Sequence, residues 1–182
     1  MESNILLGHG SGGKLSHNLI EDLFIKYFDN PVLKQQTDSA LLDINIANIA
    51  FTTDSYIVDP IFFPGGDIGK LSVCGTVNDL AVSGATPKYL SVSFIIEEGF
   101  STKELETIVS SMADEAKRAG ILIVTGDTKV VNKGKCDKLF INTSGVGFIE
   151  EKYKSISTGE KIKTGDKIII NGAIADHGMA IM

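Results

Sequence analysis

Four aspartates stand in short polar or glycine-containing stretches between apolar runs, namely Asp38, Asp54, Asp79 and Asp127. Mg²⁺ takes oxygen ligands and is commonly shared between a few carboxylates and the phosphates of a substrate. Lys129, two residues after Asp127, adds the positive charge that a polyphosphate needs. Each aspartate alone is more typical of a turn or a helix cap. Together they predict a site for Mg²⁺ and phosphate.

A glycine-rich segment near the start, Gly8-His9-Gly10-Ser11-Gly12-Gly13-Lys14, has almost the spacing of a phosphate-binding P-loop. The next residue is Leu15, where a P-loop needs a hydroxyl for Mg²⁺. The segment is therefore not a P-loop. Two interpretations stay open: a glycine loop whose amides fold over a phosphate, or an ordinary mobile N-terminus.

Apolar periodicity and capping residues predict three helices. The first runs from residue 15 to 27. The second covers residues 68 to 85 and has Asp67 as a plausible N-cap. A third helix follows a capping box that begins at Ser101, and it ends at Gly120.

Strands are expected between these helices, and two of them should deliver site residues. Asp54 is expected at the exit of one strand and Asp127 at the exit of another, whereas Asp79 falls inside the second helix. Residues 89–96 alternate apolar residues with serines, which indicates one buried face. The expected strands cover residues 41–42, 46–52, 89–96, 121–124 and 139–149.

Composition bounds the class of protein. The chain has 182 residues, 43% apolar and 22% charged, with a formal charge of −6, which predicts a soluble globular domain and argues against nucleic acid as a partner. Only Cys74 and Cys136 occur, and neither a signal sequence nor a membrane-spanning stretch is evident, so a cytoplasmic location is expected.

A change in composition predicts a domain boundary near residue 150. Residues 150–167 are charged and poor in large apolar side chains, and Ile168-Ile169-Ile170 is expected to begin a new strand. We therefore expect one complete domain over residues 1–150, which the family resemblance described below implies to be an ATP-binding and dimerisation domain. Residues 151–182 are then a linker and the truncated start of a second domain, so that the chain is a fragment.

Several motifs in this order and spacing resemble the HypE family of hydrogenase maturation proteins: HGSGGK, TDSALL, FPGGDIGKLSVCGTVNDLAVSGA and VTGDTKVV. That family belongs to an ATP-using group with aminoimidazole ribonucleotide synthetase, selenophosphate synthetase and thiamine-monophosphate kinase. The resemblance implies an α+β fold, with a mixed or antiparallel sheet covered by helices on one face. It also implies a homodimer in which strands of both subunits build a barrel.

The resemblance also assigns roles in a site for ATP and Mg²⁺. Asp79 and Lys129 are implied as catalytic residues, and Asp38, Asp54, Asp79 and Asp127 as metal ligands. The implied nucleotide-binding residues are Gly10, Gly12, Gly13, Asn78, Asp127 and Lys129.

The implied reaction is the ATP-dependent dehydration of a cysteine S-carboxamide to a thiocyanate, which supplies cyanide for [NiFe]-hydrogenase. The implied partners are the carbamoyltransferase HypF and the HypC–HypD complex, with no nucleic acid and no membrane. The family's acceptor cysteine lies at the extreme C-terminus. Cys74 and Cys136 are interior, so we expect that this chain alone cannot complete the dehydration.

Two alternatives remain open. The first is a small-molecule kinase or synthetase of the same superfamily. A selenophosphate synthetase is disfavoured, because no cysteine lies near Ser11 in the glycine loop. The second alternative is a nucleotide-binding scaffold without catalysis.

Overall fold

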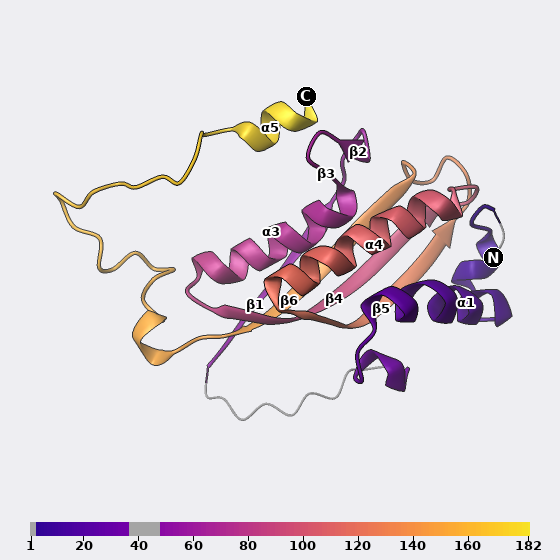
Figure 1. Cartoon of the computed structure of the whole chain (residues 1–182), viewed down its shortest axis with the longest axis horizontal. Helices are drawn as coiled ribbons and strands as arrows, with labels where there is room; N and C mark the ends of the chain where they lie inside the picture. The colour runs from indigo at the N-terminus through magenta and orange to yellow at the C-terminus, as the bar shows by residue number, and fades with distance from the viewer. Residues whose placement is uncertain (1–2, 37–47) are drawn as a thin grey trace.

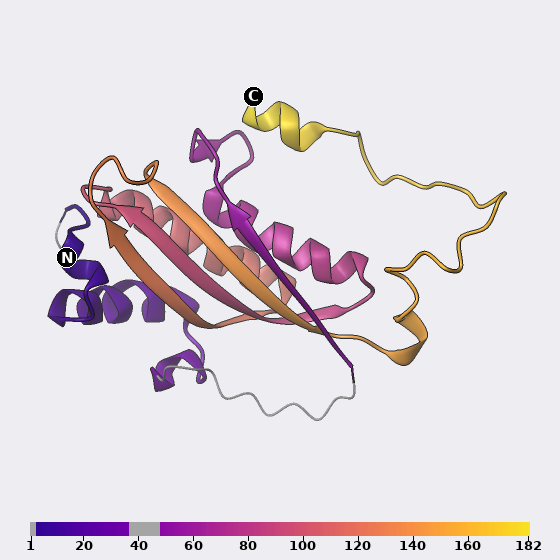
Figure 2. The ribbon, with the colours of Figure 1, turned by 180° about the vertical axis from the view of Figure 1, so that it is seen from behind.

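A four-stranded mixed sheet with helices on one face forms the body of the protein, as predicted. The computed structural model describes residues 3–36 and 48–182. The strand order is β1 (Ile49–Tyr56), β6 (Leu139–Phe148), β4 (Thr86–Glu97) and β5 (Leu122–Val131). β4 runs parallel to β5, and the other neighbouring pairs are antiparallel. Figures 1 and 2 show two long helices covering one face, with the strands uncovered when seen from behind.

These two helices begin where the capping residues predict, and the second also ends as predicted, whereas the first ends at Val82 instead of residue 85. In α3 (Ile68–Val82), Asp67 Oδ1 accepts hydrogen bonds from the amides of Gly69 at 2.7 Å and Lys70 at 3.0 Å. α4 (Thr102–Ala119) is capped by Ser101 and ends at Gly120, whose φ is 66°. Such side chains satisfy amides that have no partner inside the helix, so the capping predictions are confirmed.

α3 and α4 pack closely because of one glycine. A Cβ atom built on Gly69 would lie 2.5 Å from the carbonyl oxygen of Ile108 and 2.8 Å from the Met112 side chain. Both Ile108 and Met112 are fully buried. A side chain at residue 69 would therefore force the helices apart.

The strands have one buried and one open face. In β4, Leu90, Val92, Phe94 and Ile96 are at most 2% exposed and lie under the helices, as their spacing predicts. The alternate residues of the same strand lie on the open face. This face also carries Ile49 and Phe51 of β1, Leu122 of β5 and Ile95 of β4, which are 54%, 68%, 41% and 41% exposed.

Two predicted strand ends are wrong. Asp54 lies inside β1, paired with Thr143, and Asp127 lies inside β5, paired with Ser93. Polar residues and glycine locally resemble strand ends, but pairing with β6 and β4 keeps the backbone extended. The strand predicted over residues 41–42 and the first part of the one from 46 lie outside the described residues.

The N-terminal segment packs beside β5. It contains η1 (Leu7–Gly10), α1 (Lys14–Leu19), the π-helical η2 (Ile20–Ile25), α2 (Lys26–Phe28) and η3 (Leu33–Gln35). The predicted helix over residues 15–27 is thus confirmed. Asn30 joins this segment to the sheet, because its side-chain amide donates to the carbonyl of Ile123 at 2.8 Å.

The remaining elements are short: β2 (Phe62–Phe63), β3 (Gly66–Asp67), η4 (Glu151–Tyr153) and α5 (Asp176–Ile181). The strand predicted at residues 168–170 is not formed, because these residues pair with no strand of the described chain and are 64–95% exposed. A strand needs a neighbour to satisfy its backbone. Within the described ranges, no helix is long and apolar enough to cross a membrane. The domain limits at residues 150 and 151 stay a prediction.

A buried hydroxyl network joins α3 to the sheet and gives a pH-dependent prediction. The Tyr56 hydroxyl lies 3.1 Å from Thr76 Oγ1, which lies 2.5 Å from Thr143 Oγ1. Burial raises the pKa of Tyr56 to about 12, with a further rise from Asp54 and a partial offset from Thr76.

Because the folded protein holds this proton more tightly than the unfolded chain, Tyr56 adds stability below pH 10 that is lost as the pH rises toward 12. The Tyr56→Phe variant should therefore lose less stability across that interval than the unsubstituted protein. Urea midpoints measured from pH 8 to 12 test this, with Tyr89→Phe on the open face as control. Parallel midpoint curves for Tyr56→Phe and the unsubstituted protein would contradict it.

Candidate functional site

A cavity of about 320 Å³ lies between the N-terminal segment and β5. Apolar side chains of Leu19, Phe24 and Phe94 line part of it. Its polar border is formed by the glycine loop and by the glycine-containing part of β5, residues His9, Gly10, Gly12, Gly126, Asp127, Thr128 and Lys129. Two motifs that are more than 100 residues apart in the sequence thus border one cavity.

Serine side chains hold the glycine loop in place. Ser16 Oγ accepts from the amide of Gly12 at 2.9 Å and donates to the carbonyl of Gly8 at 3.2 Å. Ser11 Oγ donates to the same carbonyl at 3.0 Å. A Cβ atom on Gly10 would lie 2.5 Å from the amide nitrogen of Val130. The loop therefore sits directly on β5, which favours the phosphate-loop interpretation over a mobile terminus.

Asp127 and Lys129 lie on the same side of β5, as their spacing predicts. Lys129 Nζ is 3.5 Å from Asp127 Oδ2, and the two side chains are 65% and 60% exposed. The register pairs Asp127 with Ser93 on the open face of the sheet, and because β5 is an edge strand, Asp127 and Lys129 also border the cavity at this edge. An exposed ion pair of this kind adds little stability, so both charges are available to a ligand.

Asp54 and Asp79 come together at a different place, between α3 and β1. Thr52 Oγ1 donates to Asp79 Oδ2 at 3.2 Å. Asp54 is on the same face of β1 as Thr52, because side chains two residues apart in a strand share a face. Asn78 precedes Asp79 on α3 and is exposed. Asp54 and Asp79 form a second candidate group at the β1 edge, and Asn78 is next to Asp79 in the sequence of α3.

Within a single protomer, the group at β5 and the group at β1 lie far apart. β1 and β5 are the opposite edges of the sheet. With about 4.8 Å between neighbouring strands, three spacings separate them by roughly 14 Å. In the described ranges, no three His, Cys, Asp or Glu side chains have the arrangement of a metal site. Asp38 lies outside those ranges, and the fourfold metal set stays a prediction.

Sequence reasoning missed one cavity residue and assigned no role to the cysteines. No role was assigned to His9, yet it is 4% exposed and borders the cavity. Its place inside the glycine loop was the available signal. Burial raises the pKa of the Cys74 thiol, with a further rise from Glu115, and burial likewise raises that of Cys136. Neither thiol has the lowered pKa of an activated nucleophile.

The fold and the glycine-loop cavity define a class of protein. Residues 36–149 match the family model described as AIR synthase related protein, N-terminal domain, and the chain belongs to that family.

Within this class, the chain belongs to the HypE family. It is 52% identical over 186 residues to the carbamoyl dehydratase HypE of Escherichia coli strain K12, covering 99% of this chain and 54% of that protein. It therefore spans about half the length of that curated relative.

Solved structures agree with this assignment. A crystal structure of HypE in complex with ATP matches with a TM-score of 0.79 and 58% identity, covering 81% of this chain and 44% of that one. The crystal structure of a HypE–HypF complex matches with a TM-score of 0.57 and 57% identity, covering 73% and 43%.

Proposed function

We propose that this chain provides the ATP-binding and Mg²⁺-binding part of a carbamoyl dehydratase in hydrogenase maturation, acting in the cytoplasm. The observation that carries this proposal is the cavity bordered by both the glycine loop and Asp127 and Lys129. A relative with 58% identity was crystallised with ATP, which supports a nucleotide as the ligand.

The residues present fit such a ligand. Gly12 has a φ of +80°, and a Cβ built on it would meet nothing within 4 Å, so the loop presents open backbone beside the cavity. The ammonium of Lys129 suits phosphate oxygens, whereas the apolar wall at Leu19 and Phe24 suits a base. The carboxylates of Asp54, Asp79 and Asp127 are the oxygen donors that Mg²⁺ prefers.

Each group has a defined task in this proposal. ATP, when bound, supplies the phosphoryl group that makes the carboxamide oxygen a leaving group. Lys129 offsets phosphate charge, and its pairing with Asp127 keeps the ammonium near the cavity. The aspartates would hold the metal, and the glycine loop would orient the phosphates. Phosphoryl transfer depends mainly on such positioning and charge neutralisation.

The separation of the two acidic groups is resolved in a homodimer. The open sheet face exposes Ile49 and Phe51, which a second copy would cover. We place the β5 edge of one protomer beside the partner's β1, which closes the two sheets into a barrel.

The faces of the sheet on which these residues lie support this arrangement. Val92 and Phe94 line the cavity and lie on the helix-covered face, and Asp54 and Asp79 lie on the same face at β1. In the proposed dimer the cavity therefore meets the partner's Asp54 and the partner's Asp79, while Asp127 and Lys129, on the open face of edge strand β5, border the same cavity from across that edge. Each complete site then contains residues from both protomers.

HypF and the HypC–HypD complex are the proposed protein partners. The match to HypE in a HypE–HypF complex supports the first of these. The formal charge of −6 disfavours nucleic acid.

A titration with MgATP tests the nucleotide proposal. Because Lys129 offsets phosphate charge, Lys129→Ala should raise the Kd for MgATP about 10- to 100-fold, the range of one charge-assisted hydrogen bond. Lys135→Ala, an exposed lysine in the loop after β5, is the control and should leave the Kd unchanged. Isothermal titration calorimetry provides the measurement. The same loss in both variants, or no MgATP binding by the unsubstituted chain, would contradict the proposal.

A further inference from the structure

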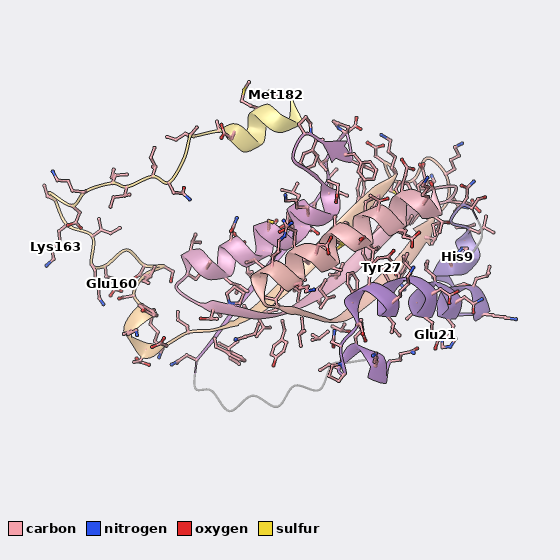
Figure 3. All side chains as sticks on the ribbon, viewed as in Figure 1. His9, Glu21, Tyr27, Glu160, Lys163 and Met182 are labelled. Carbon is pink, nitrogen blue, oxygen red and sulfur yellow. The ribbon has the colours of Figure 1, made fainter. Side chains whose placement is uncertain are left out.

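His9 borders the cavity with a ring that is almost fully buried. It lies in η1, directly before the glycines of the loop, and is 4% exposed. Figure 3 shows it in the N-terminal turn beside α1. No charged side chain of the described residues pairs with it.

One ring nitrogen of His9 is already used. The amide of Leu6 donates to His9 Nδ1 at 3.0 Å. A nitrogen that accepts a hydrogen bond carries no proton, so the neutral ring has its proton on Nε2. The carbonyl oxygen of Leu6 lies 3.3 Å from the same Nδ1. Both contacts between His9 and the backbone of Leu6 therefore involve Nδ1 and not Nε2.

The other nitrogen is a donor without an acceptor. Within the described ranges, His9 Nε2 has no hydrogen-bond partner, and no fully buried side-chain nitrogen or oxygen lacks one. Nε2 is therefore not sealed in the core. Because His9 lines the cavity and its Nε2 is neither bonded nor fully enclosed, this nitrogen is the ring atom that can reach a ligand there.

The chemistry around the cavity selects the kind of ligand atom. Gly10 and Gly12 present backbone beside the cavity, and Lys129 adds a positive charge. An N–H donor among such groups suits an anionic oxygen that accepts several hydrogen bonds at once. We propose that His9 donates its Nε2–H to a phosphate oxygen of the bound nucleotide. This assignment rests on the nucleotide site proposed above and adds a contact to it.

The His9→Asn variant separates the two nitrogens. The Asn side-chain oxygen can accept from the Leu6 amide in place of Nδ1, whereas nothing replaces Nε2. We expect the Kd for MgATP to rise about tenfold, as for one lost hydrogen bond to a charged group. The Kd for adenosine, which has no phosphate, should stay unchanged. His17→Asn, which lies on the exposed side of α1, is the matched control.

A spectroscopic measurement on the unsubstituted chain avoids any folding defect of the variant. In ¹⁵N-labelled protein, the hydrogen bond from the Leu6 amide predicts that His9 carries a proton on Nε2. MgATP should shift this Nε2 resonance, and adenosine should not. The chain has three histidines, so the missing signals of His9→Asn assign the resonance.

The outcomes separate the two proposals. Unchanged MgATP affinity in His9→Asn, or an Nε2 resonance that MgATP does not move, overturns the role of His9 and leaves the nucleotide site standing. Equal weakening of MgATP and adenosine shows that His9 only supports the loop, and this also overturns the role. If the unsubstituted chain binds neither ligand, the nucleotide site fails, and the His9 assignment fails with it.

Discussion

Gly69→Ala is expected to lower the free energy of unfolding by about 3 kcal/mol, the upper part of the range for overpacking a core. The added methyl group would lie 2.5 Å from the backbone oxygen of Ile108, which no side-chain rotation can move. Met112 is fully buried on the same side, so α4 would have to shift as a whole. The sign of the change in the free energy of unfolding is diagnostic, because Gly→Ala inside a helix otherwise stabilises a protein by about 1 kcal/mol.

Urea unfolding followed by circular dichroism measures the effect. Gly172→Ala is the matched control, since a Cβ at that position meets nothing within 4 Å. Its free energy of unfolding should stay within about 0.5 kcal/mol of the unsubstituted protein, as for most surface changes. A Gly69→Ala protein as stable as the unsubstituted protein would show that α3 and α4 are not packed as described.

A mixture of two defective protomers should recover nucleotide binding that neither has alone. In the proposed dimer, Lys129 of one protomer and the partner's Asp79 belong to the same site. Lys129→Ala and Asp79→Asn homodimers then have a defect in both sites. In a mixed dimer, both defects fall in one site, and the other site is intact.

Random assembly makes half of the dimers mixed, so about a quarter of all sites should bind MgATP normally. Protomers with different affinity tags allow the mixed dimer to be isolated, and calorimetry then gives the number of tight sites. The mixture of Lys129→Ala with itself is the control. Recovery of no tight site would place Lys129 and Asp79 in separate sites or within one protomer, and the shared site would be excluded.

Local patterns were sufficient to predict the helices. Asp67, Ser101 and Gly120 act through contacts within a few residues, so their roles follow from neighbouring sequence. The buried face of β4 could also be predicted, because alternation of apolar residues reports burial directly. The ends of β1 and β5 could not, because they depend on pairing with strands elsewhere in the chain.

The candidate site was predictable in parts. The glycine loop and the segment containing Asp127 and Lys129 were each recognised from spacing, and the structure places both at one cavity. Sequence order does not contain the order of strands in the sheet, so it could not show that Asp54 and Asp79 lie at the opposite edge. His9 was missed because its significance depends on a hydrogen bond from Leu6.

The position of the acidic groups at opposite sheet edges also has a consequence for regulation. In the proposed dimer, the fraction of complete nucleotide sites depends on the protein concentration in the cell. A single protomer has only one half of each site. Dilution below the dimer dissociation constant would then switch the activity off without any inhibitor. The expression level would then set the number of complete sites, and a protomer with one defective half would disable one site in any dimer that it joins.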